Sequence, residues 1–560
     1  MNRLWLRHYD PQVPPTLDYP RMPLYRFLDE SASGHPERSC TCFFGARLTY
    51  GRIKELSDRL AIGARQLGIR PGDRVALLLP NSPQFVIAYY GLLKAGAVVV
   101  SLNPLSTERE LAFQMTDSEC AMAITIPLFL SKLASICPTT PVKSIVYSRL
   151  ADFMPAPISL VQGYREGKLI RTAGTKSDAA FVDLRVLLQS QPAVGWQPEP
   201  VEPDEMAVLI YSGGTTGVAK GIMLSHYNLV ANAHQIGVWG QITEQDRLLA
   251  VLPLFHGYGM SVNLNSAIRV GGEITLIPRF NAREVARAIQ NRRPTFFTGV
   301  PTMFVALSNL PDIGKYDLSS LRGIFVGAAP LTRAIKEQFE AKTGGRMIEG
   351  YGLTEAVTAI MANPYKGMHR IGSIGIPFSD VDVRIIDLQD GRDLAPGEQG
   401  EIVLQSPTVM LGYYKMPQET KNTIVDGWLH TGDIGYMDDD GYFYITDRKK
   451  DIVKVGGFIV FPREVDEVIY QHPKVKEGIS VGIPDPYLGE RIKAFVVLKD
   501  GETATAEEMI AYLRQNLTGY KVPSAVEFRD ELPKNMIGKI LRRALREEEL
   551  EKAGPNANTA

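Results

Sequence analysis

The sequence predicts an α/β protein with a large N-terminal domain of α/β sheets plus a small β-subdomain, followed by an α+β C-terminal domain. Three observations predict it. Apolar runs alternate with helical patterns over most of 41–349, which is typical of a mainly parallel sheet covered on both faces. From 372 the pattern changes to short strands separated by Gly and Pro, and beyond 450 a compact α+β pattern follows. The expected divisions are 1–447 for the N-terminal domain, about 372–447 for the β-subdomain within it, 448–451 for the boundary and 452–560 for the C-terminal domain.

In chain order, the first segment predicts alternating helices and strands. The expected helices cover 23–32, 49–67, 81–94 and 128–135, and the expected strands cover 41–44, 75–79, 98–102, 121–126 and 144–147. Residues 148–205 carry several prolines and glycines without a strong period, so they predict an irregular connection.

A second α/β run begins with an apolar strand at 207–210, a Gly-rich loop and a strand at 222–224. Ser225 is then expected to cap a helix over 226–239. The later expected strands cover 247–252, 273–276, 296–300, 323–326, 346–349, 381–387, 400–404, 478–483, 492–498 and 525–528. The later expected helices begin at about 260 or cover 282–292, 331–343, 462–472 and 506–517.

The segment Tyr211–Gly221, YSGGTTGVAKG, has the composition of a phosphate-binding loop. Glycines let the backbone approach an anion closely and turn successive N–H groups toward it. Hydroxyl side chains add donors, and Lys220 adds a mobile positive charge. A Walker loop needs Ser or Thr after its lysine and then a helix, whereas Gly221 and a strand follow Lys220. We therefore expect a loop that flexes over phosphates rather than one fixed at a helix N-terminus.

The composition restricts the classes of partner and compartment. With 61 basic and 62 acidic residues the net charge is −1, which disfavours nucleic-acid binding. The four cysteines lack the paired spacing of a zinc site, so free buried thiols in a reducing compartment are expected. The N-terminus lacks the apolar core of a signal peptide, and Lys94 interrupts the most apolar segment, 85–100. We expect a soluble, cytoplasmic protein with no transmembrane segment.

Further polar, Gly-rich segments follow the loop: PLFHGYG (253–259), GAAPL (327–331), EGYGLTE (349–355), GWLHTGD (427–433), ITDRKKDIVKVGG (445–457) and PKNMIGK (533–539). Together with the loop, and in this order, they resemble the adenylate-forming (AMP-binding) superfamily of acyl-CoA synthetases, luciferases and peptide-synthetase adenylation domains. The resemblance covers nearly the whole chain. Segments such as GDRVALLLPN and KVPSAVEFRDELPKNMIGKILRR are most similar to bacterial long- and medium-chain fatty-acid CoA ligases.

The resemblance implies an ATP-dependent fatty-acid CoA ligase. The acid's carboxylate would attack the α-phosphate of ATP to give acyl-AMP and pyrophosphate, with Mg²⁺ bridging ATP oxygens. The thiol of CoA would then attack acyl-AMP to give acyl-CoA and AMP. Fatty acid, ATP and CoA are thus the expected partners. A homodimer and peripheral membrane contact are both compatible with the sequence.

For the first step, the resemblance implies that Glu355 and Thr216 hold Mg²⁺, that Thr354 contacts the α-phosphate region and that His256 lies near the acyl carboxylate. Tyr351 would offer a flat face to adenine. The expected ATP- and AMP-binding residues are Ser212, Gly213, Gly214, Thr215, Thr216, Gly217, Lys220, Gly327, Ala328, Ala329, Glu349, Gly350, Tyr351, Gly352, Thr354, Asp433 and Arg448. Structural alternatives stay open: a helix-start carboxylate for Glu355, a core aromatic for Tyr351 and a satisfied histidine for His256.

The C-terminal domain is expected to be mobile and to supply the adenylating lysine. By resemblance the Lys539 ammonium reaches the carboxylate and the α-phosphate when this domain closes, a role for a point charge on a long stem. The domain would then swing about a hinge at Lys450. That motion would present Val455, Gly456 and Gly457 to the pantetheine arm of CoA.

Several alternatives remain on sequence alone. They are a ligase for aromatic or other small carboxylic acids, an acyl-AMP ligase that loads a carrier protein, and a non-catalytic nucleotide sensor. The lack of an appended carrier domain favours free CoA. Acyl length is not encoded in any motif, although we expect tunnel walls near Met260 and 299–303. Some relatives place a tryptophan gate after the histidine, but this chain has Gly257, Tyr258, Gly259 and Met260 there, so no such gate is expected.

Overall fold

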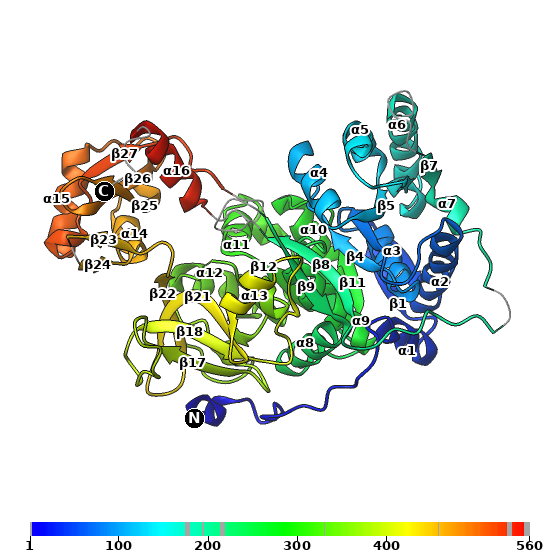
Figure 1. The fold of residues 1–560 in the computed structure, drawn as a ribbon, viewed down its shortest axis with the longest axis horizontal. Helices are drawn as coiled ribbons and strands as arrows, with labels where there is room; N and C mark the ends of the chain where they lie inside the picture. Colours follow the sequence, from blue (N-terminus) through cyan, green and yellow to red (C-terminus); the bar gives the residue numbers. More distant parts are fainter. Residues whose placement is uncertain are drawn as a thin grey trace. The chain divides into compact units, whose positions relative to one another are not determined.

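The computed structural model describes residues 3–173, 180–192, 195–212, 219–329, 331–456, 458–534 and 540–553. Over these residues the chain forms two compact units, Met1–Asp382 with Gln405–Leu429, and Val383–Leu404 with His430–Ala560. Helices and strands alternate through the first unit, and the second combines small sheets with helices (Figure 1). The α/β class predicted from the sequence is confirmed.

The first unit contains an eight-stranded sheet in the order β19-β9-β8-β4-β3-β5-β6-β7. Its strands are β3 (Arg74–Leu78), β4 (Val98–Ser101), β5 (Cys120–Thr125), β6 (Ser144–Tyr147), β7 (Ala180–Asp183), β8 (Met206–Ser212), β9 (Lys220–Ser225) and β19 (Gly412–Tyr413). The neighbouring strands from β8 through β4, β3, β5 and β6 to β7 are all parallel, whereas β8 and β9 are antiparallel. The helices in this part of the chain are α2 (Tyr50–Gln66), α3 (Pro83–Lys94), α4 (Glu108–Asp117), α5 (Pro127–Ile136), α6 (Ile158–Ala173), α7 (Leu184–Leu187) and α8 (His226–Trp239).

A nine-stranded sheet in the same unit has the order β16-β15-β14-β13-β12-β10-β11-β1-β2. Its strands are β1 (Ser39–Phe43), β2 (Ala46–Thr49), β10 (Arg247–Ala250), β11 (Glu273–Leu276), β12 (Phe296–Gly299), β13 (Gly323–Val326), β14 (Arg346–Tyr351), β15 (Met361–Ala362) and β16 (Ile376–Pro377). Its helices are α1 (Arg26–Gly34), α9 (Ser266–Val270), α10 (Ala282–Arg292), α11 (Pro301–Ser308) and α12 (Arg333–Thr343). Because β12, β13 and β14 are parallel, the loops that follow them start at one edge of the sheet.

The second unit contains two small sheets. Strands β17 (Asp382–Ile386), β18 (Gly400–Gln405) and β21 (Trp428–Met437) pair in that order, and β22 (Phe443–Arg448) also pairs with β21. The other sheet has the order β24-β23-β26-β25, with β27 on β26. Its strands are β23 (Val453–Val455), β24 (Phe458–Val460), β25 (Val475–Asp485), β26 (Gly489–Leu498) and β27 (Ala525–Phe528), and the helices beside them in the chain are α14 (Pro462–Gln471), α15 (Ala506–Asn516) and α16 (Arg542–Ala553).

Local chemistry explains why α8 begins where it was predicted to begin. The Ser225 hydroxyl accepts from the Asn228 backbone N–H, and the Asn228 side chain accepts from the Ser225 N–H. This capping box satisfies two backbone donors that the first helical turn leaves without partners. The predicted strands on either side of the phosphate-loop segment and the predicted helix after them are confirmed as β8, β9 and α8.

The prediction of an irregular connection over 148–205 is wrong, because this stretch contains α6, β7 and α7. Helix α6 buries only Glu166 and Ala173 and exposes Leu160 and Tyr164, so no inward apolar stripe marks it in the sequence. The Glu166 carboxylate instead accepts hydrogen bonds from the backbone N–H groups of Leu150 and Ala151.

Other elements also differ from the predictions. Helices α4, α11 and α16 and strands β23 and β24 were not predicted. The helix expected from about 260 starts as a π-helix over Gly259–Asn265 and becomes α-helical at Ser266. π-Helical turns are rare and are frequent at functional sites, and this one directly follows the predicted histidine segment.

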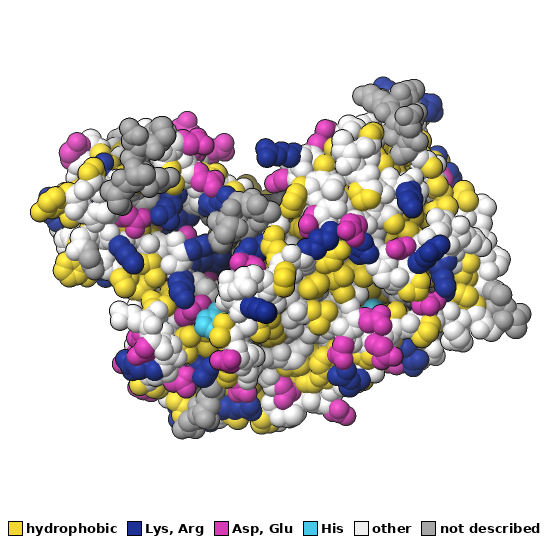
Figure 2. Space-filling view, in the orientation of Figure 1, with side chains coloured by type: hydrophobic (Ala, Val, Ile, Leu, Met, Phe, Trp, Pro, Cys, Tyr) yellow, Lys and Arg dark blue, Asp and Glu magenta, His cyan; other side chains and the backbone are white. Residues whose placement is uncertain are grey.

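All four cysteines are buried and free, as expected. Within the described ranges no helix has the length and apolar character needed to cross a bilayer. Acidic and basic side chains are interspersed over the visible face (Figure 2).

Candidate active site

The two ends of the predicted phosphate loop are fixed by the β8–β9 hairpin, in which Ser212 pairs with Lys220 and Tyr211 with Gly221. The Tyr211 hydroxyl donates to Asp117 at 2.6 Å, which anchors the entry strand. Between these ends, the predicted residues Gly213, Gly214, Thr215, Thr216 and Gly217 lie outside the described residues.

Lys220, Glu355 and Glu419 come together around one tyrosine, Tyr413. The Lys220 ammonium donates to the Glu419 carboxylate and lies 5.0 Å from the centroid of the Tyr413 ring. The Tyr413 hydroxyl donates to Glu355 Oε1 at 3.0 Å. Burial and the Glu355 charge raise the pKa of Tyr413, so the hydroxyl keeps the proton that it donates. This cluster brings the predicted phosphate clamp and the predicted metal ligand to the same side chain.

Backbone pairing explains how Tyr413 reaches that position. Strand β19 pairs antiparallel with β9, so that Tyr413 lies opposite Ile222 beside the predicted loop. The Met410 N–H donates to the Glu355 carbonyl at 2.8 Å and ties the same segment to the 3₁₀ turn Thr354–Ala356. Glu355 stands in the first turn of this short helix, as the structural alternative expected, and also faces the Tyr413 hydroxyl.

His256 is held by its own loop. Its Nδ1 accepts from the Tyr258 backbone N–H at 3.1 Å. Burial lowers the pKa of His256, so the ring is neutral near pH 7 and its proton sits on Nε2. No described residue accepts a hydrogen bond from Nε2, and the ring can therefore donate to a ligand.

The loops after β10, β13 and β14 pack closely. A β-carbon on Gly327 would lie 3.2 Å from the Tyr258 hydroxyl oxygen and 3.3 Å from the Gly350 carbonyl oxygen. A β-carbon on Gly352 would lie only 0.9 Å from the Thr358 carbonyl oxygen. The approach at Gly352 requires glycine, and the contacts bring the predicted histidine, nucleotide and Thr354–Glu355 segments together within the first unit.

The other predicted nucleotide-binding residues, which lie after β13 and at the end of β14, differ in how exposed they are. Ala328 and Ala329 are exposed, and Ala328 has a positive φ of 67°. Tyr351 is half-buried at the end of β14, whereas Glu349 is buried and accepts from the Leu331 N–H at 3.0 Å. Glu349 therefore holds the 327–331 loop, while Tyr351 and the two alanines present the more accessible surface.

In the second unit, Asp433 and Arg448 lie opposite each other on β21 and β22. Arg448 Nε is 3.0 Å from Asp433 Oδ1, with the carboxylate side chain 3% exposed and the guanidinium 45% exposed. Lys450 is exposed, and Val455 is buried at the end of β23. Gly456 has a positive φ of 56°, which glycine adopts without strain.

Two further predicted residues, Gly457 and Lys539, lie outside the described residues. Arg542, which follows them in α16, contacts Asp447, Asp451 and Asp466. Asp447 and Asp451, on either side of the predicted hinge residue Lys450, thus pair with one guanidinium of the C-terminal helix within the same unit.

Sequence reasoning missed Tyr413, Glu419, Tyr258 and Thr358. Tyr413 and Glu419 belong to the segment LGYYKMPQET, which shows no glycine-rich or charged motif of its own. These two residues reach the site because β19 pairs with β9, about 190 residues earlier in the chain. At that separation the sequence pattern does not predict which residues of the two strands pair. The paired glycines around Tyr258 were a usable signal, since they indicate close backbone approach.

A matched pair of tyrosine variants tests the role of Tyr413. We expect Tyr413→Phe to raise the Mg²⁺ concentration needed for half-maximal acid activation by about 10- to 100-fold, because partners that orient a ligating carboxylate typically contribute that much. Tyr414→Phe is the control, since its hydroxyl makes no hydrogen bond to a described residue. A Tyr413→Phe titration curve that overlays that of Tyr414→Phe would refute the role.

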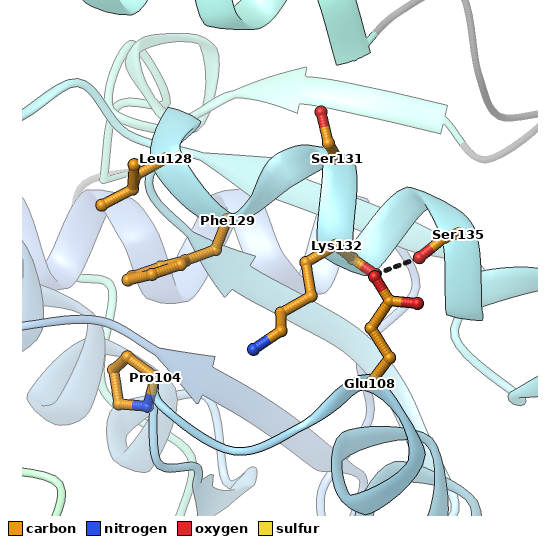
Figure 3. A pocket seen from close by; sticks show the side chains of 7 residues that line it. All are labelled: Pro104, Glu108, Leu128, Phe129, Ser131, Lys132 and Ser135. Carbon is orange, nitrogen blue, oxygen red and sulfur yellow. Dashed lines mark hydrogen bonds between the residues drawn. The ribbon is translucent and has the colours of Figure 1, made fainter.

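A cavity of about 790 Å³ lies apart from these residues, between α4 and α5 (Figure 3). Its lining consists of Pro104, Glu108, Leu128, Phe129, Ser131, Lys132 and Ser135. The Lys132 ammonium is already bonded to the Ser106 carbonyl oxygen. None of the predicted site residues lines this cavity, so the candidate site is defined by the loop cluster and not by it.

The family model of the AMP-binding enzyme matches residues 28–414, and that of the AMP-binding enzyme C-terminal domain matches 464–539. A long-chain-fatty-acid–CoA ligase of Bacillus subtilis is 40% identical over 549 residues, covering 98% of both chains. The enzyme of the same name from Yersinia pestis is 39% identical over 562 residues, covering 98% of this chain and 99% of its own.

Solved structures show the same architecture. A crystal structure of an anthranilate CoA ligase in complex with anthranoyl-AMP superposes with a TM-score of 0.83 at 27% identity, covering 96% of this chain and 99% of that one. The similarity extends over both units of the chain.

Proposed function

The chain belongs to the AMP-binding enzyme family, and from this premise we propose that it is a fatty-acid CoA ligase that consumes ATP and CoA. The observation that carries this conclusion is the 40% identity to a long-chain-fatty-acid–CoA ligase over 98% of both chains. The reaction joins a carboxylic acid to a thiol in two steps, with acyl-AMP as the intermediate. A ligase for aromatic acids is the second candidate, favoured by the likeness to the anthranilate enzyme.

In the first step the fatty-acid carboxylate attacks the α-phosphorus of ATP and pyrophosphate leaves. Negative charge that develops on the phosphates is stabilised by donors and cations fixed around it. We assign this task to the loop after β8, to Lys220 and to Thr354. Lys220 is ion-paired with Glu419, so a phosphate that binds the Lys220 ammonium would compete with this carboxylate.

A magnesium ion would fit beside Glu355. Mg²⁺ prefers oxygen ligands and is usually bound through one or two carboxylates plus substrate phosphates. Such a site needs no preformed cluster, and none with three His, Cys, Asp or Glu side chains occurs in the described part of the chain. When bound, the ion would neutralise charge on the phosphates. Tyr413 would keep the Glu355 carboxylate oriented toward it.

We place the nucleoside at Asp433 and Arg448. A carboxylate can accept hydrogen bonds from both hydroxyls of a ribose, and the Arg448 guanidinium, whose Nε is 3.0 Å from Asp433 Oδ1, holds this carboxylate in place. Tyr351 would stack on adenine. For the second step, we propose that the unit carrying Lys450 reorients, withdraws Lys539 and presents Val455 and Gly456 to CoA.

Product analysis tests the reaction. The purified chain is incubated with palmitate, ATP, Mg²⁺ and CoA, and the nucleotide and thioester products are quantified. The proposal predicts AMP, pyrophosphate and palmitoyl-CoA in equal amounts. Formation of ADP and phosphate, or thioester from benzoate or anthranilate but from no fatty acid, would contradict it.

A further inference from the structure

The Asp447 carboxylate lies before the predicted hinge at Lys450 but is bonded to groups that follow this hinge in the chain. Asp447 belongs to β22, where it pairs with Ile434 of β21. Its Oδ2 accepts from the Arg463 backbone N–H at 2.8 Å, and its Oδ1 lies 3.3 Å from Arg542 Nη1. The carboxylate side chain is 2% exposed. Asp447 therefore joins the sheet before the hinge to two helices after it.

The contact with Arg463 completes the start of α14. A helix N-terminus leaves backbone N–H groups without partners, and the side chain just before the helix usually accepts from one of them. Phe461 holds that position here and offers no acceptor, and Pro462 has no N–H to donate. The Asp447 carboxylate accepts from the Arg463 N–H instead, and the positive end of the helix dipole favours its charge. Helix α14 is thus capped by a residue from the other side of the hinge.

Arg542 has other carboxylate partners, which lie on its own side of the hinge. It is the first residue of α16, and its side chain is 16% exposed. Its Nη2 pairs with Asp466 of α14, and Asp451 Oδ2 lies 3.6 Å from its Nη1. Helices α14 and α16 both pack on β25 and β26, through residues such as Val465 and Leu545. A rotation about the hinge would therefore keep the pair between Arg542 and Asp466.

The same rotation would separate Asp447 from its partners. A swing about Lys450 moves α14 and α16 together relative to β22, so the contacts of Asp447 with Arg463 and Arg542 must both break. A buried carboxylate that loses its partners is destabilising, whereas the guanidinium keeps Asp466 as a counter-ion. The rotated arrangement is thus penalised at Asp447 alone, as expected for a contact that favours one position of a mobile part.

We propose that Asp447 is a positioning residue that latches α14 and α16 against β22, and that this latch opens when the C-terminal domain swings about Lys450. The inference rests on the proposed function and adds to it a residue that sets the balance between the two half-reactions. Lys539 lies three residues before Arg542 in the chain. The latch therefore acts on the helix that follows the adenylating lysine.

Trypsin cleavage at the hinge tests the latch without any substrate. Arg448, Lys449 and Lys450 are exposed residues after which trypsin cuts, and cleavage of a segment that opens transiently tracks the population of its open form. We expect Asp447→Asn, which keeps the shape and removes the charge, to speed cleavage at 448–450 by about 10- to 100-fold. This is the range for one hydrogen bond to a charged group. Fragment masses identify the bond that is cut.

Asp466→Asn is the matched control. It removes the charge of another carboxylate that pairs with Arg542, but Asp466 lies on the same side of the hinge as this guanidinium. Burial raises the pKa of Asp466 to about 6, so the digest is run at pH 8, where the wild-type carboxylate is charged. Its cleavage at 448–450 should stay within about threefold of wild type, because no contact across the hinge is removed.

The two half-reactions provide the second readout. The ratio of pyrophosphate exchange to thioester formation from supplied acyl-AMP should shift by at least about 10-fold in Asp447→Asn and stay near wild type in Asp466→Asn. An unchanged ratio in Asp447→Asn would overturn the role of the latch in the reaction.

The digest decides the latch independently of activity. The latch is overturned if Asp447→Asn is cut at 448–450 no faster than wild type or Asp466→Asn. Equal acceleration at sites outside 448–450 would also overturn it, since that result indicates general loosening of the fold. If wild type activates no fatty acid, the proposed function fails, and the cleavage rates still show whether Asp447 holds the hinge.

Discussion

Replacing Lys539 by alanine (Lys539→Ala) is expected to lower the rate of acyl-adenylate formation by at least about 100-fold, which is the effect of removing one fixed group that stabilises developing charge. The same variant should form acyl-CoA from supplied acyl-AMP and CoA at close to the wild-type rate. The reason is that we place the Lys539 ammonium at the carboxylate and α-phosphate only during adenylation. Pyrophosphate exchange reports the first step, and thioester release from synthetic acyl-AMP reports the second.

Lys534→Ala provides the control for this variant. Lys534 belongs to the same segment, but its ammonium pairs with Glu477 at 2.5 Å within the second unit. Both half-reactions should therefore stay near wild type when Lys534 is replaced. Equal loss of both half-reactions in Lys539→Ala would refute the division of labour between two conformations.

Glu355→Gln is expected to lower the rate of adenylation by about 100- to 1,000-fold, the range for groups that stabilise developing charge in a water-poor site. Glutamine keeps an oxygen that accepts from the Tyr413 hydroxyl but removes the negative charge that an Mg²⁺ ligand needs. Tyr413→Phe makes the complementary change, because it keeps the charge and removes the hydrogen bond.

The two variants should therefore differ in how they respond to metal. Excess Mg²⁺ is expected to restore much of the activity of Tyr413→Phe and little of that of Glu355→Gln. The check is a Mg²⁺ titration of exchange activity at fixed ATP and palmitate. Full recovery of Glu355→Gln at high Mg²⁺ would show that this carboxylate is dispensable for metal binding.

Local chemistry made much of the fold predictable. Strands such as β11 and β13 and helices such as α8 and α10 occur at the predicted residues, because buried apolar runs and side-chain caps are local signals. Helix α6 escaped prediction since its exposed face carries Leu160 and Tyr164 and its buried face carries Glu166. The strand β19 has only two residues, and its partner β9 is set by tertiary packing rather than by sequence pattern.

The candidate site was predictable to a similar, limited extent. Glycine-rich motifs indicated the loops around Glu355, His256 and Gly327, because close backbone approach requires glycine. Tyr413 could not be placed, since its hydrogen bond to Glu355 joins segments that are separate in the chain. Thr358 was hidden for a different reason, because its positive φ runs against the intrinsic preference of a β-branched residue.

The central claim is that this chain activates fatty acids by adenylation, and carboxylate-dependent pyrophosphate exchange in the absence of CoA tests it most directly. Wild-type protein is assayed with ATP, Mg²⁺ and a series of acids from acetate through octanoate to palmitate, together with benzoate and anthranilate. The account predicts exchange that is stimulated by medium- or long-chain fatty acids and depends on Lys539. Stimulation by the aromatic acids alone, or nucleotide binding without exchange for any acid, would contradict it.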